Sequence, residues 1–353
     1  MRNVFNCFAP RHKAVLEGKE KTTMIETLLI GNGFDIAQGY KTDYGDFIAF
    51  TESPGNECDE KIKKICGENP FIRYFKKIKS IQNWIDVEKE IGVICLCFSK
   101  IMAYLDSNQL NEAVKRENLT KKERTVVDSF HFLFRARSAE IIFDQKYASF
   151  DAYEVVKELR QYHEEMITVL AYYFDREVGR LKSEEIAKPD CINKKHFDYV
   201  IDFNYTPTYK NFGIKDEDVL FIHGRIDNPN TMVLGMPDGI CDDIKLVYFT
   251  KFFQRIQKHT GVLNVSRLSG GSAQAESIAH VFGMSLGKND EDIIRKVFNN
   301  VDMVLIYYNG QKDYEGKIVN LISIFGRDSV EKNINDNKWI FIDLTYETEN
   351  QYK

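Results

Sequence analysis

Six short apolar segments recur along the chain and predict the strands of one sheet. They lie near 27–30, 197–203, 219–223, 277–283, 302–308 and 338–343. A short apolar run bounded by glycine or polar residues is typical of a strand buried on both faces, as in a parallel sheet. Helical patterns near 242–258, 290–299 and 314–325 separate the later strands. We therefore expect an α/β fold with a Rossmann-like, mostly parallel sheet.

Between the first two strands lies a long stretch whose apolar residues recur every three or four positions. This spacing predicts helices near 71–84, 86–105 and 153–182. A simple crossover between parallel strands needs only about a dozen residues. We therefore expect a helical insertion at 43–188, a Rossmann-like nucleotide-binding domain formed by 24–42 and 189–353, and an N-terminal extension at 1–23.

Glycines and polar residues follow four of the predicted strands. The first strand runs into Gly31-Asn32-Gly33-Phe34-Asp35, and later strands lead to Asn204, His223 and Ser285. Ligands bind at the carboxyl ends of the strands in open α/β sheets, so these residues are expected to line one cleft. Glycine permits close backbone approach, although Ile36 stands where a GxGxxG motif has its third glycine.

Composition narrows the class of protein. The 353 residues carry a net charge of −5, which argues against broad non-specific nucleic-acid binding. The sequence has no apolar run long enough to span a membrane. Seven cysteines without a secretory signal indicate reduced thiols and a cytoplasmic location. Cys95 and Cys97 lack a second pair at a zinc-binding spacing, so we expect them to pack in a core, and we expect no metal site.

Two basic stretches support an alternative partner. Residues 61–64 are rich in lysine, and residues 73–79 interleave basic and aromatic side chains, which suits single-stranded nucleic acid. Helices with a lysine-rich solvent face are far commoner. Nucleic acid is therefore a less favoured partner than a nucleotide.

Asp86 and Glu88 place two carboxylates close to Trp84. Residues two apart do not share a helix face, and acidic residues favour the first turn of a helix. The two carboxylates are candidates for catalysis or substrate positioning, with helix capping as the alternative. We expect the helical insertion to cover the cleft and to bring this segment to its rim. Lys251 and Arg255 lie four apart and either meet a phosphate or an acidic partner, or face solvent.

Together these motifs resemble the AbiH family of bacterial abortive-infection (phage-defence) proteins. The resemblance extends from about Met24 to Phe325. Related sequences often carry histidine where this chain has Met284. The family implies a role in phage defence, with a homo-oligomer or a defence-system protein as partner. The anchors of the resemblance are Gly31-Asn32-Gly33-Phe34-Asp35, Trp84-Ile85-Asp86-Val87-Glu88, Phe203-Asn204-Tyr205-Thr206, Ile222-His223-Gly224, Lys251-Phe252-Phe253-Gln254-Arg255-Ile256 and Phe282-Gly283-Met284-Ser285-Leu286.

The order of the motifs is similar, more distantly, to that of sirtuin-like NAD-consuming defence domains, which implies NAD as the substrate. The matching positions are Gly31, Gly33 and Asp35 in the glycine turn, Asn204 and His223 at strand ends, and Ser285 and Asp290 in a later turn. The candidate catalytic residues are His223, Asn204, Asp86 and Glu88. The candidate nucleotide-binding residues are Gly31, Asn32, Gly33, Phe34, Asp35, Thr206, Gly283, Ser285 and Asp290.

The chemistry implied is cleavage of the bond between nicotinamide and ribose. By analogy with glycoside cleavage, its transition state resembles an oxocarbenium ion, so the protein must hold the ribose and activate water or a hydroxyl group. Histidine suits that step, and the amide of Asn204 suits ribose hydroxyls. A hydrogen-bonded loop histidine and a turn-forming asparagine are the structural alternatives. The expected function is hydrolysis of NAD or a related nucleotide; the alternatives are a nuclease acting on tRNA or other nucleic acid, and a non-catalytic nucleotide sensor.

Overall fold

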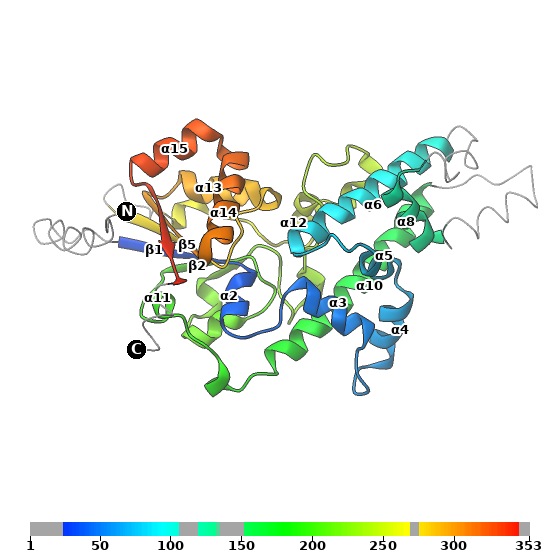
Figure 1. The fold of residues 1–353 in the computed structure, drawn as a ribbon, viewed down its shortest axis with the longest axis horizontal. Coiled ribbons are helices and arrows are strands. Elements are labelled where there is room, and N and C mark those ends of the chain that lie inside the picture. The colour runs from blue at the N-terminus through cyan, green and yellow to red at the C-terminus, as the bar shows by residue number, and fades with distance from the viewer. Residues whose placement is uncertain (1–23, 106–118, 132, 134–151, 269–274, 346–353) are drawn as a thin grey trace, which may run out of the picture.

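The computed structural model has an α/β lobe built on a six-stranded parallel sheet and, beside it, a helical lobe (Figure 1). The structure describes residues 24–105, 119–131, 133, 152–268 and 275–345, so the expected N-terminal extension at 1–23 lies outside the described residues. The strand order is β3-β2-β1-β4-β5-β6, which confirms the Rossmann-like prediction. The strands are β1 (Met24–Ile30), β2 (Tyr199–Asp202), β3 (Val219–Phe221), β4 (Glu276–Phe282), β5 (Met303–Tyr308) and β6 (Trp339–Asp343).

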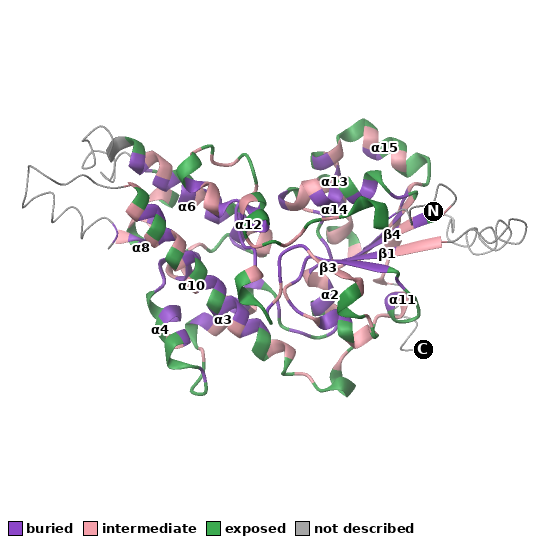
Figure 2. Cartoon of the chain, turned by 180° about the vertical axis from the view of Figure 1, so that it is seen from behind, coloured by how far each residue is buried: buried purple, intermediate pink, exposed green. Residues whose placement is uncertain are grey.

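Helices cover both faces of the sheet because successive side chains of a strand point to opposite faces. Leu29 packs into a core with α13, α14 and α15, whereas Leu28 and Ile30 pack on the side of α2 and α11. Figures 1 and 2 show these two helix layers above and below the strands. The helices of this lobe are α2 (Asn32–Ala37), α11 (Asp190–Asn193), α13 (Glu291–Asn299), α14 (Gly310–Phe325) and α15 (Arg327–Asn335).

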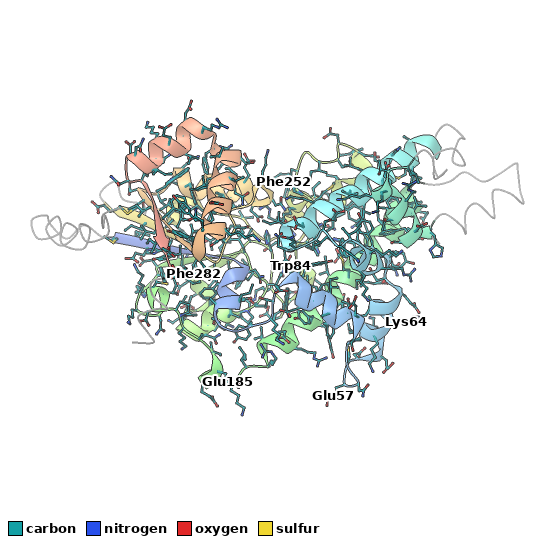
Figure 3. The ribbon with its side chains drawn as sticks, viewed as in Figure 1. Glu57, Lys64, Trp84, Glu185, Phe252 and Phe282 are labelled. Carbon is teal, nitrogen blue, oxygen red and sulfur yellow. The ribbon has the colours of Figure 1, made fainter. Side chains whose placement is uncertain are left out.

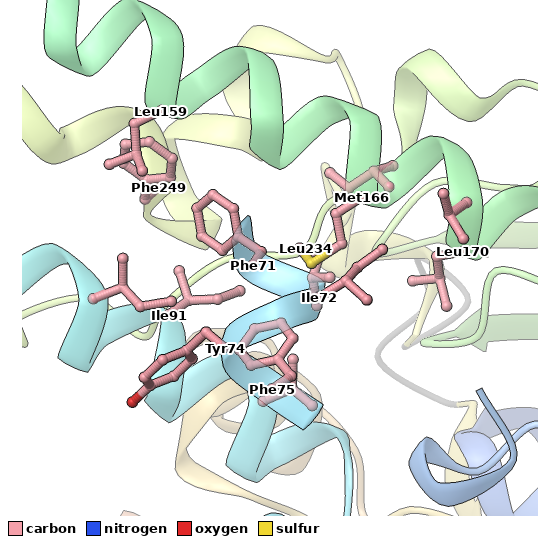
Figure 4. Close-up of a cluster of buried hydrophobic side chains, with 14 of the residues drawn as sticks. Phe71, Ile72, Tyr74, Phe75, Ile91, Leu159, Met166, Leu170, Leu234 and Phe249 are labelled. Carbon is pink, nitrogen blue, oxygen red and sulfur yellow. The ribbon is translucent and has the colours of Figure 1, made fainter. Parts of the chain in front are cut away.

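The helical lobe has a hydrophobic core of its own, part of which Figure 4 shows. Residues 226–249 also contribute to this core, so a segment that follows β3 returns to the helical lobe. None of the described helices combines the length and apolar character needed to cross a bilayer. The helices here are α3 (Tyr44–Glu52), α4 (Glu60–Glu68), α5 (Pro70–Lys77), α6 (Trp84–Leu105), α8 (Lys121–Ser129), α10 (Ala152–Val178) and α12 (Lys251–Gln257).

Local sequence signals explain where several helices begin. The Asn69 side chain accepts hydrogen bonds from the amides of Phe71 and Ile72, with Pro70 in the first turn of α5. The expected helix near 71–84 ends at Lys77, and α6 begins separately at Trp84. Asn83 explains the new start, because its Oδ1 accepts a hydrogen bond from the amide of Asp86 (3.1 Å).

The aromatic residues of the basic stretch at 73–79 are not a stacking surface. Tyr74 and Phe75 are buried in the helical core, as Figure 4 shows. Lys76 donates to the carbonyl oxygens of Thr51 (3.0 Å) and Cys66 (3.2 Å). The pattern of charge and aromatic residues therefore arises from an amphipathic helix whose aromatic face is core, and it gives no support to nucleic-acid binding.

Candidate functional site

A cleft of about 480 Å³ opens at the carboxyl ends of the central strands, where the strand order reverses between β1 and β4. Ligands of open α/β sheets bind at such a reversal point. The α/β lobe supplies one wall. The helical lobe supplies the other wall, through residues 83–85, Glu88 and Phe174. Figure 3 shows Trp84 between the two lobes.

All but two of the candidate residues line this cleft. The strand ends at Asn204, His223 and Ser285 therefore converge with the glycine turn, although they come from distant parts of the sequence. The residues that line it are Gly31, Asn32, Gly33, Asp35, Glu88, Asn204, Thr206, His223, Gly283, Ser285 and Asp290.

Phe34 and Asp86 lie elsewhere. Phe34 is fully buried and packs against Phe212 and Phe282, with ring centroids 5.2 Å and 6.0 Å away. Asp86 lies in the first turn of α6, where its Oδ2 accepts a hydrogen bond from the amide of Gln82 (3.0 Å). Phe34 is thus a core residue and Asp86 stabilises a helix start, whereas Glu88, two residues further on, faces the cleft.

The glycine turn makes its closest contacts with the protein itself. The amide of Gly33 donates to the carbonyl of Gly283 (2.8 Å), and the amide of Gly31 donates to that of Phe282 (3.2 Å). A Cβ on Gly33 would lie 2.7 Å from the Gly283 Cα, and Gly283 has a φ of +67°. These glycines therefore let two turns touch, and their engaged amides are not offered to a phosphate.

Asp35 joins the glycine turn to the loop after β2. Its Oδ2 accepts a hydrogen bond from Thr206 (2.5 Å), and its Oδ1 accepts from Thr208 (2.5 Å) and from Asn204 Nδ2 (3.2 Å). Burial raises the pKa of Asp35 to about 7, although the two threonine hydroxyls oppose this shift. Asp35 thus holds the site together, with both carboxyl oxygens engaged within the protein.

Asn204 presents one polar atom to the cleft. Its Nδ2 donates to the carbonyl of Gly31 (3.1 Å) as well as to Asp35. No donor among the described residues bonds its Oδ1, and this orientation of the amide follows from the hydrogen-bond network. Asn204 Oδ1 is therefore an acceptor suited to a hydroxyl group or a water molecule.

His223 is held by both ring nitrogens. Because a carbonyl only accepts, Nδ1 carries a proton and donates to Phe203 O (3.0 Å). Nε2 lies 2.9 Å from Asp290 Oδ1 and 3.3 Å from Lys251 Nζ. The neutral ring accepts from Lys251 through Nε2, and the protonated ring donates from Nε2 to Asp290. Both protonation states thus have a partner in place.

Lys251 completes a charge cluster with Glu88, His223 and Asp290. Its side chain is only 1% exposed, and Nζ lies 2.7 Å from Glu88 Oε1 and 3.0 Å from Asp290 Oδ1. Burial opposes the charged form, but Asp290 and Glu88 raise the pKa of Lys251 above its usual value. Burial also opposes ionisation of Asp290, yet Lys251 and His223 hold its pKa well below the usual range. Lys251 does not itself line the cleft, but it pairs with Glu88 and Asp290, which do.

Comparison with protein-family models identifies a family. A family model described as bacteriophage abortive infection AbiH matches residues 27–308, from β1 to β5. Matches were found neither among curated proteins nor among solved structures.

Proposed function

We propose that this chain, which belongs to the bacteriophage abortive infection AbiH family, hydrolyses NAD or a related nucleotide at its glycosidic bond. Family membership gives the chain a role in abortive infection. Depletion of a nucleotide in the infected cell would serve that role, because phage growth needs the metabolism of its host.

One observation carries the proposal: His223 and Asn204 meet in a single cleft at the reversal point of the sheet. His223 has its Nδ1–H fixed by Phe203 and its Nε2 beside Asp290. Asn204 presents only an acceptor to the same cleft. A proton acceptor beside a group that holds a ribose hydroxyl is what hydrolysis at the anomeric carbon needs.

The proposed step balances without a metal or a further co-reactant. The oxygen of a water molecule bonds to ribose C1′ while the bond from C1′ to the base nitrogen breaks. Nicotinamide departs with the bonding electron pair as a neutral molecule. The water gives one proton to the hydrogen-bonded pair of His223 and Asp290, where it is held between His223 Nε2 and Asp290 Oδ1, and the pair then releases a proton to solvent. Lys251 keeps Asp290 ionised for this purpose.

The test measures release of nicotinamide from NAD by the purified full-length chain. We expect His223→Ala to lower kcat by about 10²–10⁴-fold, and Asn204→Ala to impair cleavage as well. His196→Ala is the matched control, because the His196 side chain is 89% exposed. A folded His223→Ala variant that cleaves NAD at the original rate would overturn the proposal.

A parallel assay with RNA, with and without a divalent metal ion, separates the alternatives. Degradation of RNA with NAD left intact would favour a nuclease. Binding of NAD without cleavage would favour a nucleotide sensor.

A further inference from the structure

The cleft continues away from the charge cluster along α14. A second hollow of about 380 Å³ adjoins it and shares Ser285, Asn309, Asp313 and Lys317 with the main cleft. The Lys317 side chain is 3% exposed. Among the described residues that line the main cleft, Lys317 is the only lysine or arginine. A buried cation thus stands where the two spaces meet.

Lys317 retains donors that the protein does not use. Its Nζ donates to Asp313 Oδ1 (2.6 Å), and no second acceptor for it is found in the described part of the chain. An ammonium group has three donors. Asp313 is already engaged through its other oxygen, which accepts from the amide of Asn309 (2.9 Å). Burial lowers the pKa of Lys317, although Asp313 opposes that shift, so an added anion would stabilise the charged form.

We propose that Lys317 binds the phosphate groups of the nucleotide, so that the hollow along α14 is a phosphate subsite. The identity of the ligand as a nucleotide rests on the proposed function. The amides of Gly31 and Gly33 are engaged within the protein, so these two glycines give the phosphates no donor. Lysine recognises phosphate as a point charge. With the phosphates bound at Lys317, Asn204 and His223 remain available to contact the ribose.

The first test compares two ligands that differ in phosphate. Calorimetric titration of the full-length chain with ADP-ribose and with adenosine measures both affinities. A charge-assisted hydrogen bond is worth about ten- to hundredfold in affinity. We expect Lys317→Met to weaken ADP-ribose binding by that factor and to leave adenosine binding unchanged.

The matched control is Lys194→Met. Lys194 pairs with Asp190 four residues earlier at 2.6 Å, with the same order and distance as Lys317 and Asp313, but the Lys194 side chain is 70% exposed and lies outside the cleft. We expect this control to leave both affinities unchanged. Equal losses for the two ligands in Lys317→Met, or no loss for either, would overturn the subsite.

Asp313→Asn provides a second test if Lys317→Met folds poorly. The titration is made at pH 6 so that Lys317 keeps its proton without Asp313, and there the removal of a negative charge beside Lys317 is expected to raise the affinity for ADP-ribose by about fivefold. A merely structural ion pair predicts a loss instead, and that loss would overturn the subsite.

The subsite and the proposed hydrolysis fail in distinguishable ways. NAD cleavage with unchanged KM in Lys317→Met would overturn the subsite and leave hydrolysis standing. Binding of ADP-ribose that depends on Lys317, without cleavage of NAD by the wild-type chain, would support the subsite and overturn hydrolysis.

Discussion

The charge cluster of Glu88, His223, Lys251 and Asp290 is tested most directly by Lys251→Met. Methionine keeps most of the buried volume of the lysine stem and removes only the ammonium group. Two carboxylates then lose the cation that lies 2.7 Å and 3.0 Å away. Removal of one partner from a buried ion pair costs about 3–5 kcal/mol because it leaves an uncompensated charge. We expect the free energy of unfolding near pH 8 to fall by that amount.

The loss is expected to depend on pH. In the wild-type chain the pKa of Asp290 is lowered, so its contribution is present above about pH 4 and is lost as the pH falls further. Without Lys251, only His223 opposes the effect of burial, so we expect the pKa of Asp290 to rise. A raised carboxyl pKa stabilises the native state at low pH, and that stabilisation is lost as the pH rises. The gap between the two proteins therefore widens from acid to alkaline pH.

The assay is urea unfolding followed by circular dichroism at pH 5 and pH 8. We expect the gap to be smaller at pH 5 by about 1–2 kcal/mol. Lys258→Met is the control: its side chain is 8% exposed, donates to Met232 O (2.6 Å) and pairs with the exposed Glu164. Its cost should be about 1 kcal/mol at either pH. A gap for Lys251→Met that is the same at both pH values, or below about 1 kcal/mol at pH 8, would refute the reasoning.

Two further predictions concern carboxylates of the site. Burial raises the pKa of Asp35 from 3.8 to about 7, so its native form binds a proton that the unfolded chain has released, and this stabilisation is lost as the pH rises through that window. The wild-type chain should therefore lose about 3 kcal/mol of unfolding free energy between pH 4.5 and pH 8 that the Asp35→Asn variant does not lose. Unfolding free energies of the two proteins that change in parallel with pH would contradict this. Glu88→Ala should lower the rate of NAD cleavage by about tenfold or more through its effect on Lys251. Asp86→Ala should leave that rate within about twofold and lower the free energy of unfolding by about 1 kcal/mol. Equal effects of the two variants on the rate would contradict a role for Glu88 in the reaction.

The strands and the convergence of their ends could be read from the sequence, because apolar runs such as 27–30 end in glycine or polar residues. Parallel strands deliver those residues to one edge of the sheet, which brought Asn204, His223 and Ser285 together. The return of residues 226–249 to the helical core could not be read in this way. That packing depends on contacts between segments far apart in the chain, and no local pattern encodes them.

The side chains that were misplaced or missed have local explanations. Glu88 and Asp86 lie two apart on α6, so the helix allows only one of them to face the cleft. For Lys251 the sequence left a phosphate, an acidic partner and solvent as alternatives; its position directly after the Thr250 cap, in the first turn of α12 where a cation opposes the helix dipole, favours the acidic partner. A buried lysine at that position is stabilised by carboxylates from other segments of the chain, and here Glu88 and Asp290 supply them.

The charge cluster joins the two lobes, and other contacts join them as well. The ring of Phe174 stacks on Tyr205 with centroids 5.8 Å apart, and the indole nitrogen of Trp84 donates to Thr42 O (2.9 Å). Apolar residues of similar volume often replace a buried ion cluster with no loss of stability. Stability alone therefore does not explain four titratable groups at this position. The proposed hydrolysis would account for them, because Lys251 and His223 favour the ionised form of Asp290, and an ionised Asp290 would stabilise a protonated His223 during the reaction.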